Sequence, residues 1–137
     1  DAGAHSVEAG VEGGGEGLMI SNTTLERVPG RRGPYGEEAG GLAGRPLAPR
    51  GRAMLGIVAE AAAGRLALVA CGGIETGMDI LERIRMGADL VQVYTAFAYE
   101  GPALVSRLKR EMLDIMRREG VENLDDIRGT GIRGIRR

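Results

Sequence analysis

The sequence predicts a parallel α/β fold, because short apolar runs alternate with segments of helical periodicity along its 137 residues. Three apolar runs lack a regular polar alternation, which is typical of strands that are buried on both faces of a parallel sheet. Each run ends in small or polar residues. Farther along the chain, each run is followed by a segment in which apolar residues recur every three to four positions, as in a helix with one buried face. The predicted order is strand and then helix, three times.

The predicted strands are short, and the residues that follow them differ in kind. The strands cover residues 18–20, 66–70 and 90–93. The segments that follow contain hydroxyl, amide and glycine residues and cover residues 21–24, 71–73 and 94–95. Ligand sites of parallel α/β folds lie at the carboxyl ends of the strands, so these three segments form the candidate site.

Helical periodicity predicts helices over residues 52–63, 77–86 and 102–119. Thr76 and Asp79 have the spacing of a capping box at the start of the second helix, with Asp in place of Glu or Gln. Pro102 stands at the start of the third helix, where its missing N–H has no consequence. A glycine follows each helix, as is typical of helix ends: Gly64, Gly87 and Gly120.

Both ends of the chain depart from this pattern. Val7 and Val11 would share one face of a short helix, but the glycine run that follows breaks it, so residues 1–16 are interpreted as a flexible glycine-rich lead or insertion. Residues 17–119 carry the strand–helix units. Residues 120–137 form a basic tail, and we expect its arginines to be solvated: Arg128, Arg133, Arg136 and Arg137.

Composition excludes several classes of protein and site. The chain has 18 basic and 19 acidic residues and a formal net charge of −1, so it has no bulk attraction for nucleic acid or an anionic membrane. One Cys and one His exclude an intrachain disulfide and a multi-Cys or His-rich metal site. No apolar run reaches the roughly 18 residues of a membrane span, and no signal peptide is expected.

Two turns of the predicted site favour phosphate. Gly72 and Gly73 follow the second strand and precede a capped helix start, so backbone N–H groups and a positive helix end come together. Thr95 precedes a second turn and helix start one strand–helix unit later. Because two such turns occur in successive units, an ordinary tight turn is a weaker explanation of Gly72-Gly73. In (βα)8 barrels a phosphate is often held by the loops after the last two strands.

Asn22 and Thr23 offer amide and hydroxyl groups for a polar, planar ligand at the end of the first strand. Such a cluster alone is more often a helix cap or turn, but here a long loop rich in glycine and proline follows, over residues 25–50. Three glycines within residues 40–44 allow its backbone to approach a flat ligand closely. Cys71, with no neighbouring base, is interpreted as an inert core thiol.

Two architectures accommodate three strand–helix units: a small three-layer domain, or part of a larger (βα)8 barrel. Three units alone leave strand edges open, and a parallel sheet needs both faces covered. The chain has only three Tyr, one Phe and no Trp, and its strands are as short as barrel staves. These observations favour the barrel.

Four segments together resemble the C-terminal part of the quinone-dependent (class 2) dihydroorotate dehydrogenases. They are ISNTT, GGLAGRPL, ACGGIETGMDILERIRMGADLVQVYTAF and GPALVSRLKREM, at residues 20–24, 40–47, 70–97 and 101–112. Each motif alone is weak, but the set is specific, and the resemblance covers residues 17–120. It implies that the chain carries the sixth, seventh and eighth units of a (βα)8 TIM barrel that holds FMN.

The resemblance implies roles for individual residues. Asn22 and Thr23 stand at the positions that hydrogen-bond the dihydroorotate ring. The implied FMN-binding residues are Ser21, Gly44 and a phosphate cradle formed by Gly73, Tyr94 and Thr95. The chain departs from the family pattern at Ala70-Cys71, where Gly-Val is usual, and at Tyr99-Glu100, where Phe-Trp is common, but neither departure removes a ligand group.

The function implied is the oxidation of dihydroorotate to orotate in pyrimidine biosynthesis, with FMN as cofactor and a quinone as electron acceptor. The family's catalytic serine base, its flavin-adjacent lysine and its quinone- and membrane-binding N-terminal segment have no counterpart in residues 1–137. We therefore expect a C-terminal fragment that contains no catalytic residue. The location implied is the mitochondrial inner membrane or, alternatively, the bacterial cytoplasmic membrane.

Two other functions stay open. Another FMN- or phosphate-binding barrel, such as a hydroxy-acid oxidase or a nucleotide dehydrogenase, would share the phosphate cradle. The segment Asn22-Thr23-Thr24, together with the glycine loop, favours dihydroorotate oxidation over these. The missing base would also suit a non-catalytic product that only binds or assembles.

Overall fold

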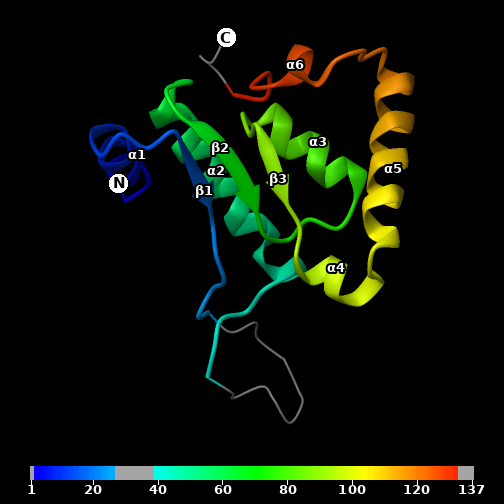
Figure 1. Cartoon of the computed structure of the whole chain (residues 1–137), viewed down its shortest axis with the longest axis horizontal. Coiled ribbons are helices and arrows are strands. Elements are labelled where there is room, and N and C mark those ends of the chain that lie inside the picture. Colours follow the sequence, from blue (N-terminus) through cyan, green and yellow to red (C-terminus); the bar gives the residue numbers. More distant parts are fainter. Residues whose placement is uncertain (1, 27–38, 133–137) are drawn as a thin grey trace.

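The computed structural model describes residues 2–26 and 39–132, which form a parallel sheet flanked by helices (Figure 1). The sheet has three strands, which lie side by side in chain order: β1 (Gly17–Ile20), β2 (Ala67–Cys71) and β3 (Leu90–Gln92). The three predicted strands are confirmed to within one residue at either end. Because the strands are parallel, their carboxyl ends lie at one edge of the sheet.

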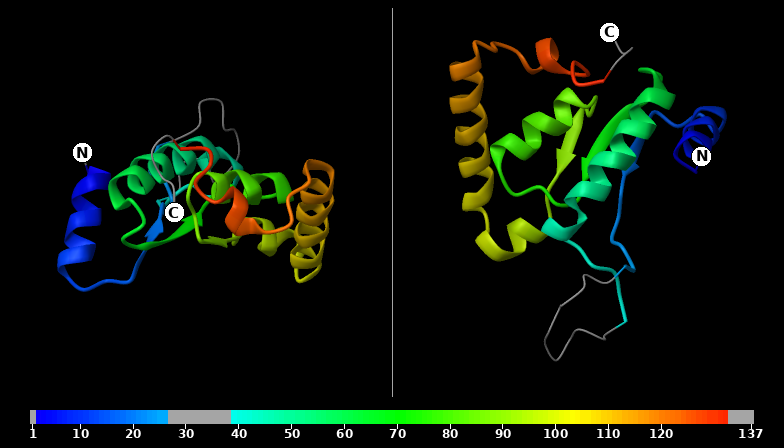
Figure 2. Two further views of the ribbon diagram at one scale, coloured as in Figure 1. Left: turned by 90° about the horizontal axis from the view of Figure 1, so that it is seen from above. Right: turned by 180° about the vertical axis from the view of Figure 1, so that it is seen from behind.

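One face of the sheet packs against helices α2 (Ala48–Ala62) and α3 (Gly77–Arg85) (Figure 2). On the opposite face Met19 lies beside Val69, which lies beside Leu90, and no described element covers this face. Met19 is 62% exposed and Leu90 is 63% exposed. The prediction of strands buried on both faces is therefore wrong for the described chain, which covers only one.

Helix α1 (Ala2–Glu12) packs against α2 and the nearby β1. Val7 is fully buried in the core that β1, β2 and α2 share. Gly3 permits a close contact between the helices, because a Cβ at this position would lie 2.9 Å from Ile57 Cγ2. The expectation of a flexible lead is therefore wrong for α1. Burial of Val7 stabilises the helix, and the glycine run only ends it.

Helix α2 begins four residues before its predicted start, after a 3-10 turn, η1 (Arg45–Leu47). Pro49 lies in its first turn, where the missing N–H leaves no helical hydrogen bond unmade. None of the helices in the described ranges is long and apolar enough to cross a membrane.

The predicted capping box at the start of α3 is confirmed. Thr76 Oγ1 accepts a hydrogen bond from the Asp79 N–H (3.1 Å), and the Asp79 carboxylate accepts one from the Thr76 N–H (2.9 Å). Helix α3 packs against α5 (Ala103–Glu119). A short helix, α4 (Thr95–Glu100), precedes α5 and was not predicted, because six residues are too few to show a period.

Residues 121–132 pack on the helices and do not form a solvated tail. The short helix α6 (Leu124–Ile127) buries Ile127 in the core between α3 and α5. Arg128 Nη1 forms an ion pair with Asp125 at 2.7 Å. The tail prediction is wrong for this part, because it overlooked apolar residues that recur every three positions and end at Ile127. Arg133, Arg136 and Arg137 lie outside the described residues.

Glu111 links α5 to the first turn of α3. Its Oε2 accepts a hydrogen bond from the Gly77 N–H at 2.7 Å, and its Oε1 accepts one from Arg107 Nη1 at 2.6 Å. The hydrogen bond from Gly77, with that from Arg107, outweighs the effect of burial and holds the pKa of Glu111 below its ordinary value.

We predict that Glu111→Gln lowers the midpoint of thermal unfolding of the complete protein at neutral pH. A carboxyl with a depressed pKa stabilises the fold above its unfolded value of about 4.3, and this contribution is lost as the pH falls through the folded value. The difference between wild type and variant should therefore shrink between about pH 6 and pH 3. Glu60→Gln, on the exposed side of α2, serves as the control. A difference that does not vary with pH would contradict the prediction.

Candidate functional site

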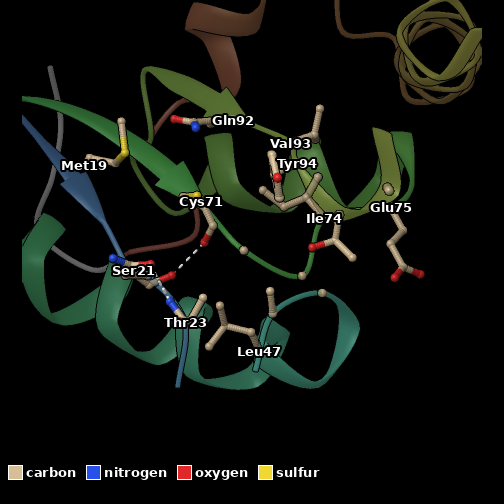
Figure 3. A pocket seen from close by; sticks show the side chains of 17 residues that line it. Met19, Ser21, Thr23, Leu47, Cys71, Ile74, Glu75, Gln92, Val93 and Tyr94 are labelled. Atoms are coloured by element: carbon tan, nitrogen blue, oxygen red, sulfur yellow. Dashed lines mark hydrogen bonds between the residues drawn. The ribbon is translucent and has the colours of Figure 1, made fainter. Parts of the chain in front are cut away.

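The segments that follow the three strands meet around one cavity of about 720 Å³ (Figure 3). Parallel neighbouring strands bring their carboxyl ends to one edge, which explains how residues distant in sequence come together there. Gln92 and Cys71 contribute to the wall from β3 and β2. All seven site residues expected from the sequence line the cavity: Ser21, Asn22, Thr23, Gly44, Gly73, Tyr94 and Thr95.

Ser21 connects the ends of β1 and β2 at this cavity. Its φ of 71° lies in the left-handed region, which a residue other than glycine adopts only where its surroundings hold it. Its Oγ donates a 2.8 Å hydrogen bond to the Cys71 carbonyl, drawn as a dashed line in Figure 3. Because the hydroxyl hydrogen is engaged there, the Ser21 oxygen offers lone pairs, and so acceptor capacity, to a ligand.

Asn22 and Thr23 are exposed beyond the end of β1. Asn22 Oδ1 accepts a 2.7 Å hydrogen bond from the Thr23 N–H, which leaves the Asn22 NH2 group as a donor. Gly41 lies directly on Thr23, because a Cβ at Gly41 would lie 1.8 Å from Thr23 Oγ1. Thr24 and Leu42 exchange backbone hydrogen bonds of 3.0 and 2.7 Å next to this crossing. The glycine-rich loop is thereby attached to the end of β1.

Glycines allow two close backbone approaches around the cavity. A Cβ at Gly73 would lie 2.5 Å from the backbone N of Ala48, and the φ of Gly73 is 68°. The turn after β2 therefore packs directly on the first turn of α2. A Cβ at Gly44, whose φ is 79°, would lie 3.1 Å from Thr95 Cγ2, so the end of the loop lies against the start of α4.

Backbone N–H groups from two neighbouring units border the same cavity. Helix α4 begins at Thr95, and the N–H groups of its first turn have no partner within the helix. No hydrogen bond between described residues uses the Gly73 N–H. Unpartnered N–H groups in adjacent turns suit an anionic group. No cluster of His, Cys, Asp and Glu suited to a metal ion occurs in the described ranges.

Charged side chains hold the loop between β2 and α3 from behind. Arg107 Nη2 donates a 3.0 Å hydrogen bond to the Glu75 carbonyl. The Asp79 carboxylate accepts hydrogen bonds from the Glu75 and Thr76 N–H groups at 3.0 and 2.9 Å. Partial burial opposes the ionisation of Asp79, but the hydrogen bonds from Glu75 and Thr76 outweigh it, so the pKa of Asp79 is lowered. A charged Asp79 therefore fixes this loop at neutral pH.

Two residues of the site differ from their sequence interpretation. Cys71 is half-buried and lines the cavity, so it is not the core thiol that was expected. It lies on the open face of the sheet, which the sequence analysis expected to be covered. Arg83, which the sequence analysis did not single out, is buried behind the turn. No local pattern marks it, because its hydrogen-bond partners Ala48 and Gly72 come from other elements.

Comparison with known proteins agrees with this geometry. A family model described as dihydroorotate dehydrogenase matches residues 4–116. A dihydroorotate dehydrogenase (quinone) of Thermus thermophilus is 50% identical over 113 residues, which are 82% of this chain and 32% of that protein. The mitochondrial dihydroorotate dehydrogenase (quinone) of Oryza sativa subsp. japonica is 43% identical over 115 residues, which are 83% of this chain and 24% of that protein. The chain thus spans about a quarter to a third of these relatives.

Solved structures show the same fold. The crystal structure of DHODH from Eimeria tenella in complex with ferulenol matches with a TM-score of 0.86 at 38% identity, over 93% of this chain and 34% of that one. The ligand-free form matches with a TM-score of 0.85. The prediction that the three strand–helix units are part of a (βα)8 barrel is confirmed. The sequence motifs, the fold and the matched relatives agree, and the chain belongs to the dihydroorotate dehydrogenase family.

Proposed function

We propose that this chain forms one wall of the active site of a quinone-dependent dihydroorotate dehydrogenase. The complete protein oxidises dihydroorotate to orotate in pyrimidine biosynthesis. The observation that carries the proposal is the convergence of all seven expected site residues on one cavity, in a chain of this family. Two relatives that the chain matches over more than four-fifths of its length carry the name dihydroorotate dehydrogenase (quinone).

The wall of the cavity suits FMN. Glycines at positions 44 and 73 let the loop lie against Thr95 and the turn after β2 lie against Ala48, and the N–H groups near Gly73 and Thr95 suit the phosphate. We assign Gly73, Tyr94 and Thr95 to the phosphate, and Ser21 and Gly44 to other parts of the cofactor. When bound, FMN accepts a hydride from the substrate and passes electrons to a quinone. The residues of this chain hold and orient it.

Asn22 and Thr23 are assigned to the dihydroorotate ring. The free NH2 group of Asn22 and the hydroxyl of Thr23 follow β1 directly, next to Ser21. Hydrogen bonds from the Asn22 amide and the Thr23 hydroxyl would fix the orientation of the ring relative to the flavin. A fixed orientation lowers the barrier for hydride transfer. We place no catalytic residue in this chain. The base that removes the substrate proton belongs to another part of the complete protein.

The quinone and the membrane are proposed partners of the complete protein, through a part outside residues 1–137. The relatives include mitochondrial forms from plants and forms from bacteria. We therefore propose a location at the mitochondrial inner membrane or, alternatively, at the bacterial cytoplasmic membrane. The net charge of −1 gives no support to a nucleic-acid partner.

We predict that Asn22→Ala in the complete protein lowers kcat/KM for dihydroorotate and leaves the FMN content unchanged. Loss of one hydrogen bond to a polar ligand in a buried site costs about 1–3 kcal/mol, which corresponds to roughly 5- to 150-fold. Steady-state kinetics and flavin absorbance measure the two quantities. Asn123→Ala, which removes the cap of α6 far along the chain, is the matched control and should keep normal turnover. Normal kinetics for Asn22→Ala, or loss of flavin, would contradict the assignment.

We predict that Gly73→Val removes FMN from the purified complete protein. A Cβ at Gly73 would lie 2.5 Å from the Ala48 backbone, so the turn has to move away from the phosphate position. Gly120→Val is the control, because Gly120 has a similar φ of 67° and nothing within 4 Å of the Cβ position. It should strain the backbone comparably and keep its flavin. Stoichiometric flavin absorbance in Gly73→Val would refute the proposed cradle.

We predict that residues 1–137 expressed alone bind FMN weakly and do not oxidise dihydroorotate. The open face of the sheet leaves the cavity without an opposite wall, so ordering the chain consumes most of the binding energy. Fluorescence titration with FMN and an assay of dye reduction by dihydroorotate check both statements. Tight flavin binding together with dihydroorotate-dependent reduction would show that this chain contains a complete active site.

A further inference from the structure

Arg83 is the buried charged residue of the described chain, with 1% of its surface exposed. Its Nη2 donates hydrogen bonds to the carbonyls of Ala48 (3.2 Å) and Gly72 (3.4 Å). These two carbonyls belong to the first turn of α2 and to the turn after β2. Arg83 does not line the cavity, whereas Gly72 and Gly73 do, so its guanidinium lies behind the turn.

The charge of Arg83 is not neutralised by a direct ion pair with any described residue. Its Nε and Nη1 are buried and have no hydrogen-bond partner within the described ranges. The nearby Glu82 carboxylate is bound by Arg52 at 3.2 Å, and the Asp79 carboxylate accepts the backbone N–H groups of Glu75 and Thr76. An unpaired buried cation is strongly destabilising unless another group compensates its charge.

The hydrogen bond to Gly72 also fixes the direction of the next N–H group. The Gly72–Gly73 peptide is trans, so the Gly72 carbonyl and the Gly73 N–H point to opposite sides of the turn. Because Arg83 holds the carbonyl from behind, the Gly73 N–H points away from Arg83. This is the N–H that no described residue accepts.

We propose that Arg83 is a positioning residue that orients the Gly73 N–H toward the phosphate of FMN and supplies, through the turn, the positive potential that this phosphate compensates. The inference rests on the proposed function. It adds that the preference for FMN over riboflavin depends on the charge of residue 83 as well as on the backbone N–H groups. Burial and the nearby charge of Arg52 lower the pKa of Arg83, but a guanidinium starts high enough to stay charged at neutral pH.

A structural role alone makes a different prediction. If Arg83 only held α2 against the turn, its charge would not matter, and Arg83→Lys, which lacks the planar fork, would lose the preference for FMN as far as Arg83→Gln does. An electrostatic role acts on the phosphate, which riboflavin lacks. The ratio of the two dissociation constants therefore separates the roles, and it does so without measuring turnover.

The test uses the complete protein, stripped of flavin and titrated with FMN and with riboflavin by flavin fluorescence. For Arg83→Gln we expect FMN affinity to fall about tenfold or more while riboflavin affinity changes less than about twofold. Arg83→Lys keeps the charge without the planar fork, so it should retain the FMN-to-riboflavin ratio within about threefold. Arg85→Gln removes a charge from the same helix at a residue paired with Glu119, and it should leave the ratio unchanged.

The outcomes are distinguishable. Equal losses for the two flavins in Arg83→Gln, or an unchanged FMN affinity, would overturn the role of Arg83. If Arg83→Gln does not fold, Arg83→Lys decides, because a collapse of its ratio would overturn the role and a retained ratio supports it. Absence of FMN binding by the wild-type protein would instead overturn the proposed function, and this inference with it.

Discussion

The close contact between the Gly72–Gly73 turn and the start of α2 is the constraint on which the site depends. A Cβ at Gly73 would lie 2.5 Å from the Ala48 backbone, so only glycine allows the strand end and the helix to meet there. One residue earlier, the Cys71 carbonyl accepts the Ser21 hydroxyl, which ties β1 to the same point. Arg83 joins the two sides of the contact from behind. The relative positions of the end of β1, the turn after β2 and the start of α2 therefore follow from how closely two backbones approach.

The elements that the sequence predicted correctly are those whose determinants are local. The Thr76–Asp79 capping box and Pro102 act within one turn of the helices that they begin, and the strands follow from short apolar runs. Helices α1 and α6 have weak local signals, Val7 with Val11 and the apolar spacing that ends at Ile127, but contacts with distant residues stabilise both helices. Val7 is held by α2 and Ile127 by α3 and α5, and no pattern within residues 1–16 or 120–137 contains those partners.

The sequence predicted the residues that line the cavity, but it did not predict the residues that hold them in place. Asn22, Thr23 and Thr95 follow strands directly, so topology alone brings them to one edge. Gly41 and Arg83 depend on tertiary contacts. Gly41 is required because the loop crosses Thr23 with no room for a Cβ, and Arg83 is buried because α3 lies behind the turn. From the sequence alone, Gly41 suggests a flexible loop, and Arg83 suggests an exposed charge on an amphipathic helix.

The open face of the sheet supports the proposal that this chain supplies binding groups and that other parts of the barrel complete the reaction centre. Loops at the carboxyl ends of all strands build a barrel site, and three neighbouring strands supply one wall of it. This wall contains N–H, hydroxyl and amide groups, which hold and orient a ligand. Proton removal requires a base within reach of the substrate, and a closed site would keep water from the reacting groups. Met19 and Leu90, each more than 60% exposed on the open face, mark where the missing wall has to pack. The same missing strands that would bury these side chains would therefore also supply the opposite wall of the cavity.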